Sequence, residues 1–181
     1  QKDAYSLNLY SDWSPNFTTE LRLSRSDFDK NPLFSQNLPS VRIRTSDGGN
    51  IYFGRDRFRH ANSLAVTDET LYLEGNYFLG NHTIKAGIDI QSHDIFNVFQ
   101  PQSYGEYTFN SIDAFRDNMV NFYELRIGTD PNNRFPAADW AWTGNGLFIQ
   151  DNWMVNQSLT IQYGLRYDRP TTDDTPLFNQ D

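Results

Sequence analysis

The chain has 181 residues, a formal net charge of -8 and no cysteine, and 15% of its residues are aromatic. The acidic charge argues against a nucleic-acid partner, because phosphate binding depends on clustered Lys and Arg. Without cysteine, neither a disulfide framework nor a thiolate metal site can form. The sequence has no run of about 18 or more apolar residues, which excludes a transmembrane helix.

The first regular pattern is an amphipathic hairpin over about residues 4–26. Apolar and polar side chains alternate over residues 4–13, which predicts a strand because successive side chains point to opposite faces. The Ser-Pro-Asn at 14–16 has the composition of a tight turn, and a second alternating segment follows it. Both segments are long enough to cross a membrane as strands.

A long connection follows over about residues 27–62, where charge and proline replace the alternation. Two short apolar pieces, at 41–44 and 50–53, flank an Asp-Gly-Gly at 47–49, which predicts a small hairpin outside the main sheet. Connections of this length are uncommon in compact domains and are usually functional or disordered.

Two more hairpins follow, at about residues 64–91 and 146–169. Gly80 and Asn81 form the turn of the first, and residues 154–158 the turn of the second. A second long connection, over about residues 92–142, separates them.

The long connections carry five candidate ligand contacts. Arg55, Arg57 and Arg59 form a basic cluster in an acidic chain, for which a solvated loop face is the simpler interpretation and an anion contact the sharper one. Trp140 and Trp142 offer aromatic surface near the end of the second connection.

The whole pattern repeats three times: long strand, short turn, long strand, long loop. It predicts an all-β fold, an antiparallel meander of about six long strands that is a segment of a large transmembrane barrel. Short periplasmic turns and long extracellular loops are typical of outer-membrane barrels in Gram-negative bacteria. The alternative is a soluble β-sandwich that binds carbohydrate or another ligand. Aromatic residues beside the short turns favour the barrel, as an interfacial girdle: Trp13, Phe17, Tyr77, Phe78 and Trp153.

In a barrel, the apolar face of each strand meets lipid and the polar face lines the lumen. The predicted lumen-lining residues with charged side chains are Glu20, Arg22, Glu74, Lys85, Asp89, Arg166 and Asp168. Structural lining is the simpler role, since few lining residues bind a ligand. Asp151 is an exception, because alternation places it on the lipid side with Ile149 and Trp153; nearness to the periplasmic interface or a local irregularity would explain it.

The sequence predicts no enzyme, no cofactor and no metal site. Its three histidines, His60, His82 and His93, lie in a loop, at a turn and near a strand end, without the spacing of a metal motif. His93 is followed by Asp94, but a catalytic pair also needs a third, orienting group, so a surface histidine is the simpler interpretation.

Two stretches carry a family resemblance. Residues 148–153 (FIQDNW) and 159–168 (LTIQYGLRYD) resemble the barrel motif of TonB-dependent outer-membrane receptors. Residues 82–89 (HTIKAGID), with the aromatic segments 97–99, 105–109 and 112–115, resemble the Oar-like subgroup of that family. The resemblance implies a cell outer membrane location and transport of a nutrient or an envelope structural role.

The resemblance also implies parts that have no counterpart in these residues: a plug domain, a TonB-contacting box and, in this subgroup, a carboxypeptidase-regulatory-like domain. Six strands do not close the barrel of roughly 22 strands that is typical of such transporters. We therefore expect a barrel segment whose partners are outer-membrane lipid, the rest of the barrel with its plug, and TonB. Alone in water it would expose strand edges and an apolar face, so we expect no stable soluble monomer.

Overall fold

A computed structural model describes residues 1–31, 37–130 and 132–175. The chain divides into two compact units, each built mainly around one sheet. The first unit comprises residues 1–28, 66–95 and 140–181, and the second comprises residues 29–65 and 96–139. We call their sheets the long sheet and the small sheet.

The long sheet has six strands in the order β1-β2-β5-β6-β9-β10. Their bounds are β1 Lys2–Ser14, β2 Phe17–Lys30, β5 Ala61–Leu79, β6 His82–Gln100, β9 Ala138–Asn156 and β10 Leu159–Thr171. The expected strand pairs are present, and most strands run further than the apolar alternation predicts. The strands are longer because alternation shows only where a strand has an apolar face, whereas hydrogen bonding between the strands continues beyond that region.

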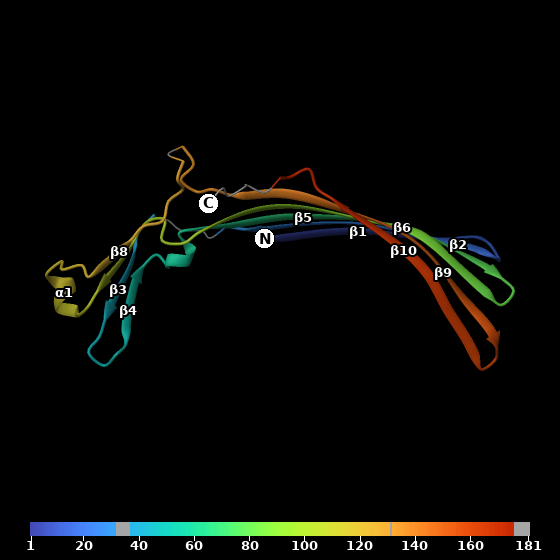
Figure 1. Cartoon of the computed structure of the whole chain (residues 1–181), viewed down its shortest axis with the longest axis horizontal. Helices are drawn as coiled ribbons and strands as arrows, with labels where there is room; N and C mark the ends of the chain where they lie inside the picture. The colour runs from blue at the N-terminus through green and yellow to red at the C-terminus, as the bar shows by residue number, and fades with distance from the viewer. Residues whose placement is uncertain (32–36, 131, 176–181) are drawn as a thin grey trace. The chain divides into compact units, whose positions relative to one another are not determined.

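Each hairpin of the long sheet closes with a two-residue turn, and the three turns lie at the same end of the sheet (Figure 1). Gly80 adopts φ 60° in the middle turn, a conformation that favours glycine. The third turn is shorter than the predicted 154–158, because Met154 still pairs with Thr160. A register shift beside this turn leaves Val155 as an extra residue, and a similar shift occurs beside the first turn at Trp13.

Side-chain contacts show how the hairpins join. Ser24 contacts Thr70 through their hydroxyl groups at 2.6 Å, while Arg25 contacts Glu69 at 2.7 Å. Residue numbers that rise on β2 as they fall on β5 indicate antiparallel pairing. The long sheet is therefore a meander, as the sequence predicts.

The apolar face of the long sheet is open. In the antiparallel registers Leu7 lies opposite Leu23 and Ile149 opposite Leu165, which places their side chains on one face. Leu165 is 79% exposed. A soluble sandwich would bury this row, so the exposure favours the barrel interpretation.

The small sheet has the strand order β4-β3-β7-β8, formed by β3 Ser40–Arg44, β4 Asn50–Gly54, β7 Glu106–Phe109 and β8 Phe122–Glu124. The predicted hairpin is confirmed as β3 and β4. The parallel pairing of β3 with β7 was not predicted, and it joins the two long connections in one sheet. These connections also contain a 3-10 helix, η1 Arg57–Arg59, and a short helix, α1 Ile112–Arg116.

The core of the second unit lies on one face of the small sheet. Ile43 and Phe109 are only 4% and 5% exposed. Phe115 of α1 packs edge-on against Phe53 at 5.3 Å and Phe109 at 5.1 Å between ring centroids. The loops predicted at 27–62 and 92–142 therefore include a packed β-structure. No helix of the described residues is long and apolar enough to cross a membrane.

Candidate functional site

The polar face of the long sheet is organised around Glu74, which is 4% exposed. Its carboxylate accepts hydrogen bonds from the Tyr72 hydroxyl and from Asn76 Nδ2 at 2.9 Å, and Lys85 Nζ lies 3.0 Å away. A buried carboxylate is tolerated when its oxygens are satisfied in this way. Glu74 and Lys85, both predicted to line the lumen, thus form an ion pair between β5 and β6.

An aromatic row crosses the same face. The Arg22 guanidinium lies 5.0 Å from the centroid of the Tyr72 ring and also pairs with Glu20. Tyr72 stacks against Phe148 at 5.8 Å between centroids. The intervening Gly87 makes this possible, because a Cβ there would lie 2.6 Å from Phe148 Cζ. The row therefore depends on a glycine in β6.

Arg166 on β10 links two further predicted lumen residues. Its guanidinium lies 3.0 Å from Asp89 on β6 and 2.7 Å from Asp168. Gly146 leaves room for this group, since a Cβ there would lie 2.6 Å from Arg166 Nη2. All seven predicted lining residues therefore share one face and pair among themselves, three cations with four carboxylates.

The two tryptophans differ in their surroundings. His93 donates from Nδ1 to Asp68 at 2.7 Å and stacks on Trp142 at 4.4 Å between ring centroids. Trp142 is therefore held by a histidine–aspartate pair, whereas Trp140 is exposed. The acidic partner of His93 is thus Asp68, on the neighbouring strand, rather than the adjacent Asp94.

Asp151 lies on the apolar face, as its position in the alternation predicts, because it is opposite Tyr163. Its Oδ2 accepts hydrogen bonds from the Tyr163 hydroxyl at 2.8 Å and from His82 Nδ1 at 2.7 Å. The His82 ring stacks in turn on Trp153. Pairing near a short turn, without a register shift at Asp151 itself, accounts for this carboxylate.

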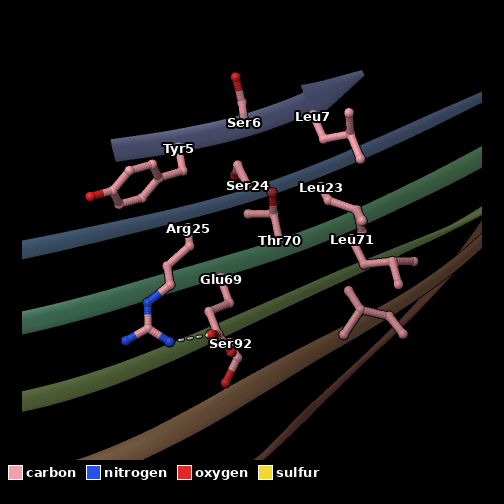
Figure 2. A pocket seen from close by; sticks show the side chains of 11 residues that line it. Tyr5, Ser6, Leu7, Leu23, Ser24, Arg25, Glu69, Thr70, Leu71 and Ser92 are labelled. Atoms are coloured by element: carbon pink, nitrogen blue, oxygen red, sulfur yellow. Dashed lines mark hydrogen bonds and ion pairs between the residues drawn. The ribbon is translucent and has the colours of Figure 1, made fainter. Parts of the chain in front are cut away.

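A shallow hollow of about 520 Å³ is centred on the apolar side of the first unit (Figure 2). Leu7, Leu23 and Leu71 lie side by side along it on neighbouring strands. Arg25 and Glu69, in contact at 2.7 Å, mark its polar rim. Such a surface accommodates an aliphatic chain better than a polar ligand.

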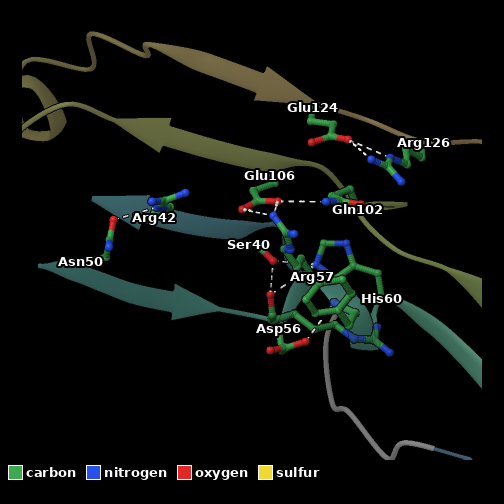
Figure 3. A network of polar contacts seen from close by, with 12 residues as sticks. Ser40, Arg42, Asn50, Asp56, Arg57, His60, Gln102, Glu106, Glu124 and Arg126 are labelled. Carbon is green, nitrogen blue, oxygen red and sulfur yellow. Dashed lines mark hydrogen bonds and ion pairs between the residues drawn. The ribbon is translucent and has the colours of Figure 1, made fainter. Parts of the chain in front are cut away.

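The second unit contains a buried polar network (Figure 3). Glu106 is buried and is held by Arg57 Nη1 at 3.2 Å and by Gln102 Nε2 at 3.2 Å. Nearby, Nδ1 of the buried His60 accepts from the Tyr104 backbone N–H at 3.1 Å. Burial lowers the pKa of His60 below its usual range.

The basic cluster of the sequence is divided among different partners. Arg57 pairs with Glu106, while Arg55 donates to Asn37 Oδ1 at 3.0 Å and lies over the Tyr104 ring. All three arginines of the cluster are half-buried, and Arg57 lies nearest the open polar face of the small sheet. The sequence interpretation missed Arg42 on that face, although its alternation with Ile43 signals a polar side.

No group of His, Asp and Glu side chains suited to a metal occurs among the residues that the structure describes. A family model described as an outer membrane beta barrel domain matches residues 6–177. No curated protein and no solved structure matches the chain. The matched region includes every strand pair of the long sheet and all of the small sheet.

Proposed function

Since the chain belongs to the outer membrane beta barrel domain family, we propose that its long sheet is a wall segment of a TonB-dependent receptor barrel. The protein is located in the outer membrane. Its role would be the uptake of an unidentified nutrient or a structural role in the envelope, without catalysis. The residues that carry the TonB-receptor resemblance, 148–153 and 159–168, form the β9–β10 hairpin.

One observation carries the proposal: the long sheet holds the charged side chains of its polar face in ion pairs around a buried glutamate, and it exposes its apolar side chains. Glu74 is buried among three donors, whereas Leu165 on the other face is exposed. This inversion suits a sheet with lipid on one side and a polar lumen on the other. Lys85, Asp89 and the other paired charges would then form the lining.

The short turns would face the periplasm and the long connections the cell exterior, as in other outer-membrane barrels. The small sheet would then be an extracellular elaboration of two loops. Strands β1 and β10 are the edges of the long sheet, and each has an unpaired side within the described residues. Further strands of a larger barrel would pair with these edges, and a plug and TonB would be the functional partners.

The wall orientation is tested by single cysteines, which the chain otherwise lacks. Leu165→Cys and Ile149→Cys probe the apolar face, and Gln162→Cys and Thr160→Cys probe the polar face. Each variant of the full protein is labelled with a nitroxide at its cysteine and placed in bilayers. Electron paramagnetic resonance then compares how often the nitroxide collides with oxygen, which concentrates in lipid, and with a water-soluble nickel complex. We expect oxygen to dominate at the first pair and nickel at the second. Equal accessibility on both faces would refute the wall and favour the soluble binding module.

TonB coupling needs a separate test. A photo-cross-linking screen across the natural full-length protein in cells should capture TonB from the periplasmic side. A protein that passes the nitroxide test yet never cross-links to TonB would be a barrel component outside the TonB-dependent class.

A further inference from the structure

We infer that the polar face of the small sheet is a binding site for a small organic anion, a carboxylate carried on a ring. The site lies within the second unit and does not depend on the orientation of the long sheet. Ligand binding there would be a function beyond that of the barrel wall.

The strand registers place one continuous row of side chains across this face. Arg42 on β3 lies opposite Tyr52 on β4, and on the other side it is paired with Thr108 of β7. Thr108 lies opposite Phe122 of β8. The row therefore reads aromatic, arginine, threonine, aromatic across four strands. Neighbouring strands are about 4.8 Å apart, so the two aromatic residues lie roughly 14 Å apart along the row.

The row is bordered on one side by Glu106 and Glu124, here called the acidic side, and on the other by Asn50 and Asn110, here called the amide side. On the acidic side, Glu106 and Glu124 lie opposite each other, and each has an arginine of its own. Arg57 lies 3.2 Å from Glu106, and Arg126 lies 2.6 Å from Glu124. Both carboxylates are thus already neutralised by the protein.

On the amide side, two arginines contact only neutral groups. Arg42 Nε donates to Asn50 Oδ1 at 2.7 Å, and Arg44 Nη1 donates to Asn110 Oδ1 at 3.1 Å. Neither has a carboxylate partner among residues 37–130 and 132–175. In a chain of net charge -8, two adjacent uncompensated guanidinium groups concentrate positive charge at this face.

The face is also hollow. A depression of about 310 Å³ is lined by Arg42, Arg44, Thr108 and Phe122 together with both glutamates. A second one of about 490 Å³ is lined by Arg42, Tyr52 and Arg57 and by the carboxylates of Asp56 and Glu106. Tyr52 and Phe122 are 66% and 55% exposed, so each ring has surface available for contact with a ligand. In Figure 3, Arg42 and Asn50 lie at the left, and Glu106 and Glu124 lie further to the right.

These features define the ligand. A guanidinium fork matches the two oxygens of a carboxylate, and Arg42 and Arg44 supply two such forks. A ring held by these arginines can lie against the exposed side chain of Tyr52 or against that of Phe122, which stand on opposite sides of Arg42 along the row. Glu124, which is partly exposed, can accept a hydrogen bond from a hydroxyl group on the ring. Inorganic phosphate has no ring, so it would gain nothing from the aromatic side chains. Both an acidic sugar and an aromatic acid have the required chemistry.

Ligand-observed nuclear magnetic resonance and calorimetry on the full chain in detergent distinguish these sources. The probes are glucuronate, 4-hydroxybenzoate and inorganic phosphate. We expect at least one ring carboxylate to bind more tightly than phosphate, and to compete with the other if both bind. Binding of glucuronate alone would identify a sugar acid, and binding of 4-hydroxybenzoate alone an aromatic acid.

Arg42→Gln and Arg44→Gln should each weaken binding about tenfold or more, because each removes a charge-assisted interaction. Arg116→Gln is the matched control, since Arg116 is exposed on α1 and its ion pair within the described part of the chain is with Asp113 alone. Circular dichroism and thermal unfolding of each variant report on folding. Two separate arginine variants are used so that the test still holds if one of them misfolds. The inference is overturned if phosphate binds as tightly as the ring carboxylates, or if Arg116→Gln weakens binding as much as the two site variants do. It is also overturned if neither ring carboxylate binds at millimolar concentration.

Discussion

The two sheets of this protein differ in what happens to their apolar faces. The small sheet buries Ile43 and Phe109 at the centre of its apolar face, where Phe109 packs under Phe115, and leaves Tyr52 exposed on the other face. The long sheet exposes Leu165 and hides Glu74 within a polar network. Both sheets follow the same alternation of side chains.

The difference teaches that alternation alone does not tell what surrounds a sheet. A water-surrounded sheet gains stability by removing apolar area from solvent, which is what the small sheet does. A sheet that lies in lipid has no such gain on its outer face, and its polar groups need partners inside. The direction of burial, rather than the period, separates the two environments.

The largest effect should come from the core of the small sheet. Phe109→Ala removes a buried ring that contacts Phe115, and we expect it to lower the free energy of unfolding of this unit by about 3–5 kcal/mol. Phe122→Ala is the control on the opposite face of the same sheet, where the ring is exposed and little should change. Hydrogen exchange of the β3 and β7 amides measures both. Similar losses in the two variants would contradict the assignment of a buried and an open face.

Next comes a charge on the apolar face of the long sheet. Leu165→Arg should destabilise the protein in bilayers by about 2–4 kcal/mol, the cost of an arginine near the bilayer midplane. Gln162→Arg, on the polar face of the same strand, should cost much less because its side chain would meet the lumen. Urea unfolding in lipid vesicles, followed by tryptophan fluorescence, compares the two. If both cost the same, the faces do not meet different solvents.

A smaller effect is expected within the polar network. Glu74→Gln leaves Lys85 without its carboxylate partner and replaces one buried acceptor oxygen by an NH2 donor. We expect it to lower the free energy of unfolding by about 1–3 kcal/mol. Glu69→Gln is the matched control, because the exposed Glu69–Arg25 pair should contribute at most about 1 kcal/mol. The same urea unfolding reports both values. A greater loss at Glu69 would reverse the roles that we give to the two faces.

The smallest effect is a pH dependence confined to the second unit. The pKa of His60 is lowered by burial, so its unfolded state binds a proton more readily than the folded state. Stability is therefore full above the unfolded pKa of about 6.5 and falls as the pH drops from there towards the lower folded pKa. Its Nδ1 already accepts the Tyr104 amide, so a proton has no partner there. Hydrogen exchange from about pH 8 to about pH 5 should show the loss near Ser40 and Tyr104, and His60→Gln should abolish it.

Much of the long sheet follows from its sequence. Alternation identified the strand pairs and the shared polar face of Glu20, Lys85 and Arg166, since pattern and pleat have the same period. Short-turn residues such as Gly80 and Asn81 identified the hairpin ends. The neighbours of Asp151 did not follow, because His82 lies 69 residues away and only the strand register brings the two together.

The small sheet was only partly predictable. Its local hairpin, β3 with β4, follows from the turn at Gly48, which adopts φ 83°. The parallel contact between β3 and β7 links distant segments, and β7 and β8 are too short to display a clear period. For the same reason, the sequence revealed the arginine cluster around Arg57 but not the face that Arg42 forms with β8.

The parallel pairing also has a consequence for the order of assembly. Ser40 pairs with Glu106, 66 residues further along, and the whole β5–β6 hairpin lies between them. Contacts of such long sequence separation form slowly because the loop must close first. We therefore expect the β5–β6 hairpin to form early and the β3–β7 ladder last. The proposed ligand site would then exist only in molecules whose intervening hairpin has already folded.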